Sequence, residues 1–142
     1  MIFPAAVTIV AASLTSGCAS IWSRGLVQDD QGQVLPAASV RVSSVANAGT
    51  VFAAGTDMFG CFLVSKSPPK GERHFRLEIT ASGYQPATFD FDLETPILIA
   101  TLARTGSGSQ SGIHPATEAE REDRWEAYCN PKFPPGAQTL GP

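Results

Sequence analysis

Histidine is scarce in this chain, and neither histidine stands in a common catalytic or metal-binding motif. The 142 residues include only His74 and His114, and neither lies in an HExxH or HxxE pattern, the spacing that brings two ligands to one metal. A Gly-x-Ser-x-Gly turn, which exposes a nucleophilic serine, is also missing. The sequence thus predicts no catalytic residue, no metal site and no cofactor, and we expect solvated or capping roles for the two histidines.

Basic clusters and long apolar runs are lacking as well. The 10 Lys and Arg residues are scattered among 13 acidic residues, and the formal net charge is -3, so we expect no nucleic-acid partner. The N-terminal apolar segment, residues 2–12, is shorter than the roughly 20 residues that cross the hydrocarbon core of a bilayer. We therefore expect no membrane-spanning helix in this segment.

The apolar segment is followed by Leu14 and then by two small residues, Ser16 and Gly17, that precede Cys18. This pattern resembles the signal of bacterial lipoproteins, in which the cysteine becomes the acylated N-terminus. The resemblance implies that residues 1–17 are a cleaved signal peptide and that Cys18 is the lipidation site, carrying acyl chains such as palmitate.

The same resemblance implies where the protein works. Several acyl chains on one cysteine anchor a protein to a membrane almost permanently, so the membrane is a predicted partner and residues 18–23 a tether. Ala19 after the cysteine favours the outer membrane, at its periplasmic face, within the cell envelope. Two alternatives are left open, an ordinary secretory signal that contains Cys18 and a buried first strand.

Seven short strand-like runs separated by turn residues occupy residues 24–104, the spacing typical of an all-β sandwich. Apolar residues occupy every second position in 75–79 and 89–93, which indicates strands with one buried and one solvated face. The sequence therefore predicts an antiparallel sandwich. The predicted strands are Gly25–Gln28, Ala38–Ser44, Val51–Thr56, Cys61–Ser65, His74–Ala81, Ala87–Leu93 and Ile97–Ala103.

Two turns begin with aspartate and end with glycine, at residues 29–32 and 57–60, and we expect each to be a tight hairpin. The alternating strands give the predicted core: Phe75, Leu77, Ile79, Phe89 and Phe91. Between them lie three acidic residues, expected on a solvated outer face, with a weak Ca²⁺ site as the open alternative: Asp90, Asp92 and Glu94.

Several residues spread over 24–104 match one family in order and spacing. They are Gly25, Val27, Asp30, Gly32, the run 35–40, Thr56, Asp57, Gly60, Phe62 and the run 81–86. This part of the chain resembles the carboxypeptidase regulatory-like domain. The resemblance implies a seven-stranded antiparallel sandwich of prealbumin-like or Ig-like type and an accessory or docking role. Cys61 stands where that family carries an exposed polar residue.

The composition changes after Arg104. Residues 105–116 are rich in glycine and serine and are predicted to be a flexible linker, followed by a short helix over 117–129 that starts at a capping box, and by an extended tail over 130–142. Trp125 and Tyr128 share one helix face. Two interpretations remain open for them, a clasp over the protein's own sheet and a binding site for a partner protein.

Three cysteines are present, and setting aside Cys18 leaves Cys61 and Cys129 as a pair in a compartment where disulfides persist. Cys61 should point to the outer face of its strand, because Phe62 is expected to face the core, and a covering helix could reach it there. We therefore predict a Cys61–Cys129 disulfide. The alternatives are a buried thiol at Cys61 with Cys129 free, and an intermolecular bond through Cys129.

The leading hypothesis is a non-catalytic cell-envelope lipoprotein that presents a small β-sandwich for docking or structural support. We expect no enzyme activity, because the sequence contains no catalytic motif. The alternative is a glycan or small-ligand binding module, for which the aromatic residues Trp22, Phe59 and Tyr84 are candidate platforms. A hydrolase would need a nucleophile and a base that the sequence does not contain in any recognised motif.

Overall fold

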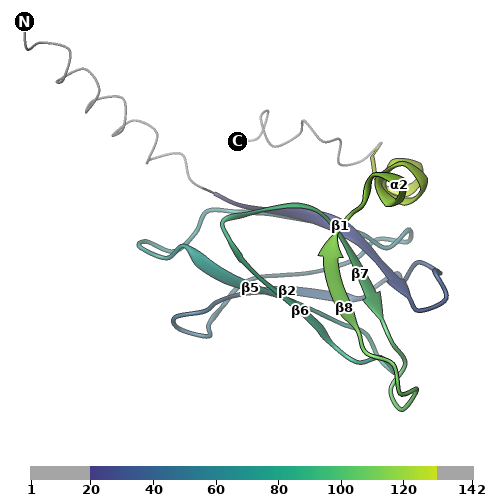
Figure 1. Ribbon diagram of the computed structural model, residues 1–142. Helices are drawn as coiled ribbons and strands as arrows, with labels where there is room; N and C mark the ends of the chain where they lie inside the picture. Colours follow the sequence, from purple (N-terminus) through teal and green to yellow (C-terminus); the bar gives the residue numbers. More distant parts are fainter. Residues whose placement is uncertain (1–19, 131–142) are drawn as a thin grey trace, which may run out of the picture.

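The computed structural model describes residues 20–130, in which two four-stranded β-sheets face each other (Figure 1). Sheet A has the strand order β4-β1-β7-β8, and sheet B has the order β3-β2-β5-β6. The chain changes sheet after β1, β3, β4 and β6. The strands are β1 (Ile21–Asp29), β2 (Ser39–Ser44), β3 (Thr50–Gly55), β4 (Cys61–Lys66), β5 (His74–Thr80), β6 (Ala87–Asp92), β7 (Glu94–Leu102) and β8 (Gly112–Pro115).

The predicted fold class, an all-β sandwich with a short C-terminal helix, is confirmed, with two differences. The sandwich has eight strands rather than seven, because β8 pairs with β7 at the edge of sheet A. One pair is parallel, since β7 runs alongside β1 in the same direction, whereas the other pairs of named strands are antiparallel. All of sheet B lies between β1 and β7 in sequence, which leaves room for a parallel crossover.

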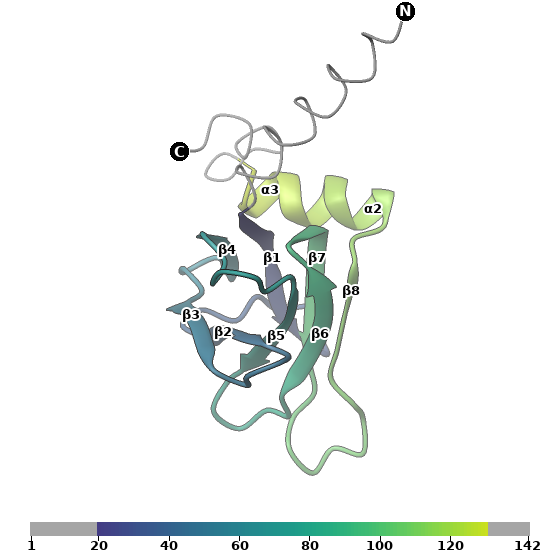
Figure 2. The ribbon, with the colours of Figure 1, turned by 90° about the vertical axis from the view of Figure 1, so that its left-hand side faces the viewer.

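The two sheets differ in burial because only one of them is covered on both faces. In sheet B, β2 and β5 alternate between exposed and buried residues, as strands with one solvated face do. In sheet A, β1 is buried along nearly its whole length, since sheet B covers one face and a C-terminal helix packs on the other (Figure 2). This helix consists of α2 (Glu118–Glu120), a π-helical turn η1 (Arg121–Trp125) and α3 (Glu126–Tyr128). The molecule thus has three layers.

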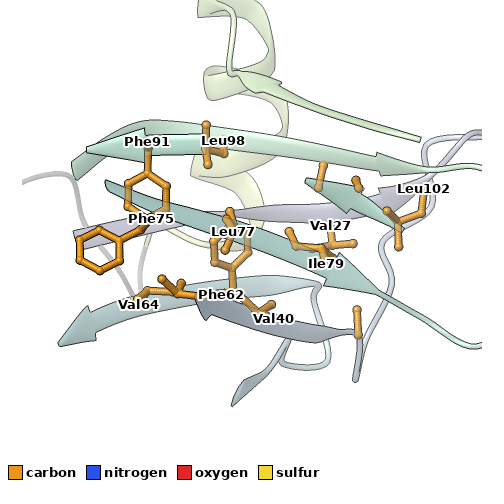
Figure 3. Close-up of a cluster of buried hydrophobic side chains, with 14 of the residues drawn as sticks. Val27, Val40, Phe62, Val64, Phe75, Leu77, Ile79, Phe91, Leu98 and Leu102 are labelled. Atoms are coloured by element: carbon orange, nitrogen blue, oxygen red, sulfur yellow. The ribbon is translucent and has the colours of Figure 1, made fainter. Parts of the chain in front are cut away.

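The main core fills the space between the sheets (Figure 3). Phe75, Leu77 and Ile79 have no exposed surface, and Phe91 is 8% exposed, which confirms the prediction for these four residues. Phe89 is only half-buried, because β6 is an edge strand of sheet B and leaves one side of this ring uncovered.

The two turns that begin with aspartate have the same local structure. In each, the aspartate Oδ1 accepts hydrogen bonds from the N–H groups two and four residues later, at 2.9 and 2.9 Å for Asp29 and at 2.9 and 3.0 Å for Asp57. The first is a short hairpin, as predicted, closed by a bridge between Gln28 and Val34. The second is not a hairpin. It carries the chain from β3 in sheet B to β4 in sheet A, and Gly60 accepts a hydrogen bond from β1.

The sandwich begins earlier than the predicted limit at residue 24. Strand β1 starts at Ile21, whose side chain is fully buried, and Trp22 is 6% exposed. The predicted tether over 18–23 therefore lies partly inside the fold. These residues extend the pairing of β1 with its two neighbours, since Ile21 stands opposite Lys66 of β4 and Trp22 opposite Glu94 of β7.

The sandwich also ends later than predicted, because β8 falls within the segment 105–116 that was expected to be a linker. The loop before β8 is held to the sheets by Ser111, whose Oγ accepts a hydrogen bond from the Ala103 N–H at 2.8 Å and donates one to the Gln85 carbonyl at 2.6 Å. The pairing of β8 uses backbone groups, which any composition supplies. The polar, glycine-rich sequence of this segment therefore contains no pattern that predicts a strand.

Candidate docking surface

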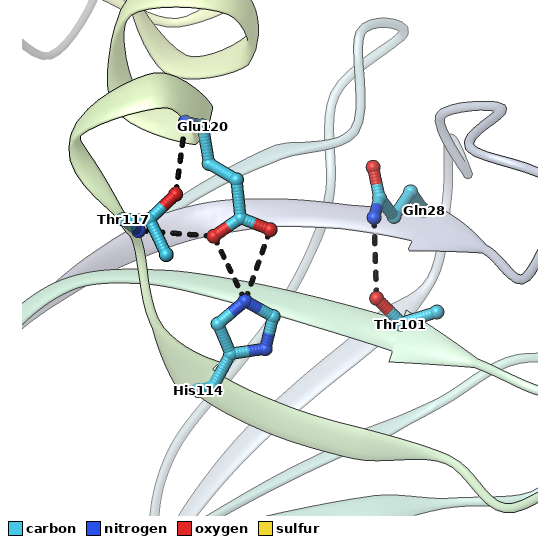
Figure 4. A network of polar contacts seen from close by, with 5 residues as sticks. All are labelled: Gln28, Thr101, His114, Thr117 and Glu120. Carbon is cyan, nitrogen blue, oxygen red and sulfur yellow. Dashed lines mark hydrogen bonds and ion pairs between the residues drawn. The ribbon is translucent and has the colours of Figure 1, made fainter.

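The C-terminal helix begins at the predicted capping box. Thr117 Oγ1 accepts a hydrogen bond from the Glu120 N–H at 3.1 Å, and the Glu120 carboxylate accepts one from the Thr117 N–H at 2.9 Å. The same carboxylate lies 2.9 and 3.0 Å from Nε2 of His114 on β8 (Figure 4). The capping box therefore connects the start of the helix to the edge strand of sheet A.

The charge of Glu120 is stabilised by these contacts. Its partial burial alone would raise the pKa of the carboxyl, but the hydrogen bonds from Thr117 and His114 outweigh burial and hold the pKa below its ordinary value. The ionised carboxylate is also favoured by its position in the first turn of the helix. The helix start is thus a polar junction that depends on one negative charge.

Trp125 fixes the middle of the helix to sheet A. Its side chain has no exposed surface and lies in a second apolar cluster with Leu26 of β1 and with Ile97 and Ile99 of β7. This cluster occupies the outer face of sheet A, opposite the main core. Trp125 was predicted as a partner-binding residue, but its burial leaves no surface for a partner, so the structure supports the clasp interpretation at this position.

A disulfide fixes the end of the helix. Cys129, directly after α3, is bonded to Cys61 at the start of β4, with 5.7 Å between the two Cα atoms. Both residues belong to the apolar cluster under the helix, whereas Phe62, the next residue of β4, belongs to the main core. The predicted pairing is confirmed, and the two alternatives with free or intermolecular cysteines do not hold in this structure.

Large apolar side chains are exposed beside this disulfide. Met58 is 71% exposed, Phe59 39% and Tyr128 38%, and the rings of Phe59 and Tyr128 stack with 6.3 Å between centroids. The Arg124 guanidinium lies 5.6 Å from the centroid of the Tyr128 ring and donates a hydrogen bond to the Gly32 carbonyl. We call Met58, Phe59 and Tyr128 the apolar patch. It joins the turn 57–60 to the end of the helix.

The sequence pointed to part of this patch only. Tyr128 was predicted as a partner-binding residue, and Phe59 was predicted to be exposed, but Met58 was overlooked. A signal was available, because the central positions of tight turns favour polar or small residues. Two large apolar residues at those positions, Met58 and Phe59, are unusual in a turn that faces water.

The three aromatic residues considered as a glycan platform do not gather in one place. Trp22 lies near the start of β1 and is almost fully buried. Tyr84 forms a bridge to Arg104 after β7, and the Arg104 guanidinium lies 5.4 Å from the centroid of its ring. Phe59 stacks on Tyr128 instead. The described residues therefore contain one aromatic surface, the apolar patch, rather than the predicted set.

Two of the three acidic residues lie on one strand as predicted. Asp90 forms an ion pair with Arg76 at 2.6 Å, and Asp92 Oδ1 is hydrogen-bonded to Nδ1 of His74, also at 2.6 Å. Hydrogen bonds from Arg76 lower the pKa of Asp90 from its ordinary value. Glu94 does not continue this face, because the chain crosses to sheet A and Glu94 begins β7. In the described range, no three His, Cys, Asp or Glu side chains gather to hold a metal.

The predicted lipidation site, Cys18, lies outside the described residues, as do the predicted signal peptide over 1–17 and the tail from residue 131 onward. Between residues 20 and 130, no helix is long and apolar enough to cross a bilayer.

No family model matches the chain, and no curated protein matches its sequence. Solved structures with a similar backbone include shaft pilin SpaA from Lactobacillus rhamnosus GG, which is 15% identical with a TM-score of 0.47, over 61% of this chain and 47% of the pilin. The chain thus spans about half the length of that pilin.

Two enzymes also have a backbone similar to that of this chain. 5-Hydroxyisourate hydrolase from Klebsiella pneumoniae is 16% identical with a TM-score of 0.49, over 68% of this chain and 94% of the hydrolase. Catechol 1,2-dioxygenase from Acinetobacter sp. ADP1 is 12% identical with a TM-score of 0.39, over 70% of this chain and 53% of the enzyme. Because these structures include a pilin and enzymes, they argue neither for nor against catalysis.

Proposed function

We propose that the protein is a non-catalytic lipoprotein of the cell envelope that is held at the membrane by acylated Cys18 and docks another envelope protein through the apolar patch. The observation that carries this proposal is the exposure of Met58, Phe59 and Tyr128 side by side. Aromatic and methionine side chains on a fixed surface are characteristic of protein-binding sites.

The patch is held in place from two sides, which suits a docking surface. The Cys61–Cys129 disulfide lies next to Tyr128, and the hydrogen bonds of Asp57 fix the turn that carries Phe59. A rigid surface loses little conformational entropy on binding. The disulfide also agrees with an oxidising compartment such as the periplasm.

The direction of the strands supports a patch that faces away from the membrane. Cys18 is three residues before Ile21, where β1 begins, whereas Cys61 beside the patch pairs with Leu26, five residues further along β1. Five residues of strand span about 17 Å. A protein anchored at Cys18 would hold the patch at the far end of the sandwich, within reach of a partner in the aqueous compartment.

The lipid anchor is tested by labelling cells with a clickable palmitate analogue. The wild-type chain should take up the label and Cys18→Ser should not, because the acylated sulfur is lost. Label on the Cys18→Ser variant at the wild-type level would rule out Cys18 as the anchor.

The docking surface is tested by photo-crosslinking in living cells, with a benzoylphenylalanine residue introduced at Met58. We expect one dominant protein adduct, which should disappear when Tyr128→Asp is added. Thr88, exposed on the distant edge strand β6, is the matched control position and should give no such adduct. The proposal fails if Met58 and Thr88 give the same products, or if Tyr128→Asp leaves the Met58 adduct unchanged.

A further inference from the structure

Three cations without an ion pair lie on a single segment of the chain. Lys66 ends β4, and Lys70 and Arg73 follow in the loop to β5. All three are exposed, and none forms an ion pair with another residue of the described range. The other cations of that range, except Arg121 on the helix, interact with acidic groups or aromatic rings: Arg24, Arg41, Arg76, Arg104 and Arg124.

This segment, residues 66–73, lies at the end of the sandwich where β1 begins. Lys66 stands opposite Ile21, the first residue of β1, in the β1–β4 register. Figure 1 shows the loop that leads into β5 and the first residues of β1 on the same side of the molecule. The first residues of β1 and the basic segment therefore lie at the same end of the sandwich.

Acids also lie at this end of the sandwich, since Glu94 stands opposite Trp22 in the β1–β7 register and Asp92 stands opposite His74 in the β5–β6 register. The basic segment itself remains cationic. Segment 66–73 carries three cations and one acid, Glu72, which gives a formal charge of +2. At the opposite end, the turns 29–32 and 57–60 carry three aspartates and no cation. The side chain of Asn47 hydrogen-bonds to Glu72, so the acid of the basic segment is drawn toward the neighbouring loop.

We propose that residues 66–73 bind the anionic phospholipid headgroups of the membrane that holds Cys18, an inference that rests on the lipid anchor proposed above. Three residues of chain reach about 10 Å at most, so the start of β1 stays close to an acylated Cys18. The Debye length at physiological ionic strength is about 8 Å, so Lys66, Lys70 and Arg73 would experience the surface potential of the bilayer.

This contact would orient the sandwich. A short lipid tether alone lets the domain tilt. An anionic bilayer repels Asp92 and Glu94 at this end, so the attraction acts on segment 66–73 itself and turns the loop between β4 and β5 toward the membrane. Repulsion of Asp29, Asp30 and Asp57 at the opposite end acts in the same direction. The apolar patch would then point away from the membrane. The basic segment thus sets the direction in which the docking surface faces.

The test uses the full mature protein reconstituted in two kinds of vesicle, phosphatidylcholine alone and an equal mixture of phosphatidylcholine and phosphatidylglycerol. Protein that floats with the vesicles is treated with an amine-acylating reagent, and the modification rate of Lys66 is measured by mass spectrometry. We expect Lys66 to react about fivefold more slowly on the anionic vesicles, the factor expected for one cation at such a surface. The difference should vanish at about 1 M salt, where the screening length is roughly 3 Å.

Two variants separate headgroup contact from a general effect of surface charge. In Lys70→Ser/Arg73→Ser, Lys66 should react equally fast on both kinds of vesicle, because two of the three contacts are lost. Arg121→Ser removes an unpaired cation from the helix and should keep the wild-type difference. Equal Lys66 rates on the two vesicles, or an unchanged difference in Lys70→Ser/Arg73→Ser, would overturn this inference alone. Failure of the protein to float with neutral vesicles would overturn the lipid anchor, and this inference with it.

Discussion

Gly25 leaves no room for a side chain, because β1 is covered closely on its inner face. A Cβ atom at this position would lie 2.4 Å from the Leu98 carbonyl oxygen and 2.8 Å from the Phe62 ring. Gly25→Ala should therefore lower the free energy of unfolding by about 1–3 kcal/mol, the usual cost of overpacking. Gly112→Ala is the control, since nothing lies within 4 Å of its Cβ position. Urea denaturation should give a lower midpoint for Gly25→Ala only.

Phe75 and Phe89 are both apolar residues of alternating strands that contribute to the main core, but their burial differs. Phe75 has no exposed surface, so Phe75→Ala should cost about 3–5 kcal/mol of unfolding free energy. Phe89 is half-buried on the edge strand β6, so Phe89→Ala should cost clearly less. Urea denaturation of both variants measures the difference. Equal losses would mean that β6 is covered in solution by something beyond the described residues.

Glu120 makes the helix start sensitive to acid. Because its pKa is lower in the folded state than in the unfolded state, its contribution to stability is complete above the ordinary glutamate pKa of about 4.3 and is lost as the pH falls through the folded-state pKa. Glu120→Gln should therefore be less stable than the wild type at pH 7 and nearly as stable at strongly acidic pH. Urea denaturation at both pH values measures this, and a gap that does not close in acid would contradict the assigned role.

At the scale of elements, the disulfide and Trp125 hold a helix that would be marginal alone. The bond joins residues 68 apart in sequence, and a bridge over a loop of this length contributes about 4 kcal/mol in the chain-entropy model. We expect the Cys61→Ala/Cys129→Ala variant to unfold at a clearly lower urea concentration than the wild type. Non-reducing peptide mapping of the mature wild-type protein should recover the two cysteines in one linked peptide pair, and separate free thiols would contradict the bond.

The sequence predicts best those elements in which the type of each side chain depends on whether it is buried, solvated or capping a helix. The alternation in β5 and β6 reflects a buried and a solvated face, and the capping box at Thr117 uses side-chain groups. Strand β8 has a single large aliphatic residue, Ile113, and is held by backbone pairing with β7, so the sequence shows no alternating pattern that would predict it. The sequence also does not predict which sheet the chain enters after Asp57, because the same turn can close a hairpin within one sheet or connect two sheets.

Part of the candidate docking surface could also be predicted from the sequence, and part could not. The Cys61–Cys129 pair follows from strand alternation, because the residue next to an inward Phe62 points outward to the covering helix. The burial of Trp125 and the exposure of Tyr128, three residues apart on the same helix, could not be separated. Which of two neighbours on one helix face contacts the sheet depends on the position of the helix over β1 and β7, and a helical pattern contains no such information.

At the scale of the whole molecule, the helix and β8 are part of the folded unit rather than an appendage. The sequence alone suggests that residues 24–104 fold independently. The structure instead places Trp125 over Leu26 and Ile99 and pairs β8 with β7, so a chain that ends at Arg104 exposes the outer face and the edge of sheet A.

The loss can be compared with the stability of a small domain. Removing a buried tryptophan costs about 3–5 kcal/mol and removing the disulfide about 4 kcal/mol, whereas domains of this size have only about 5–15 kcal/mol in total. We therefore expect the chain that ends at Arg104 to lose its cooperative thermal transition, and the chain that ends at Asn130 to keep it. Circular dichroism during heating measures both. A cooperative transition in the shorter chain would show that sheet A is stable without its third layer, because the main core between the sheets would then be sufficient.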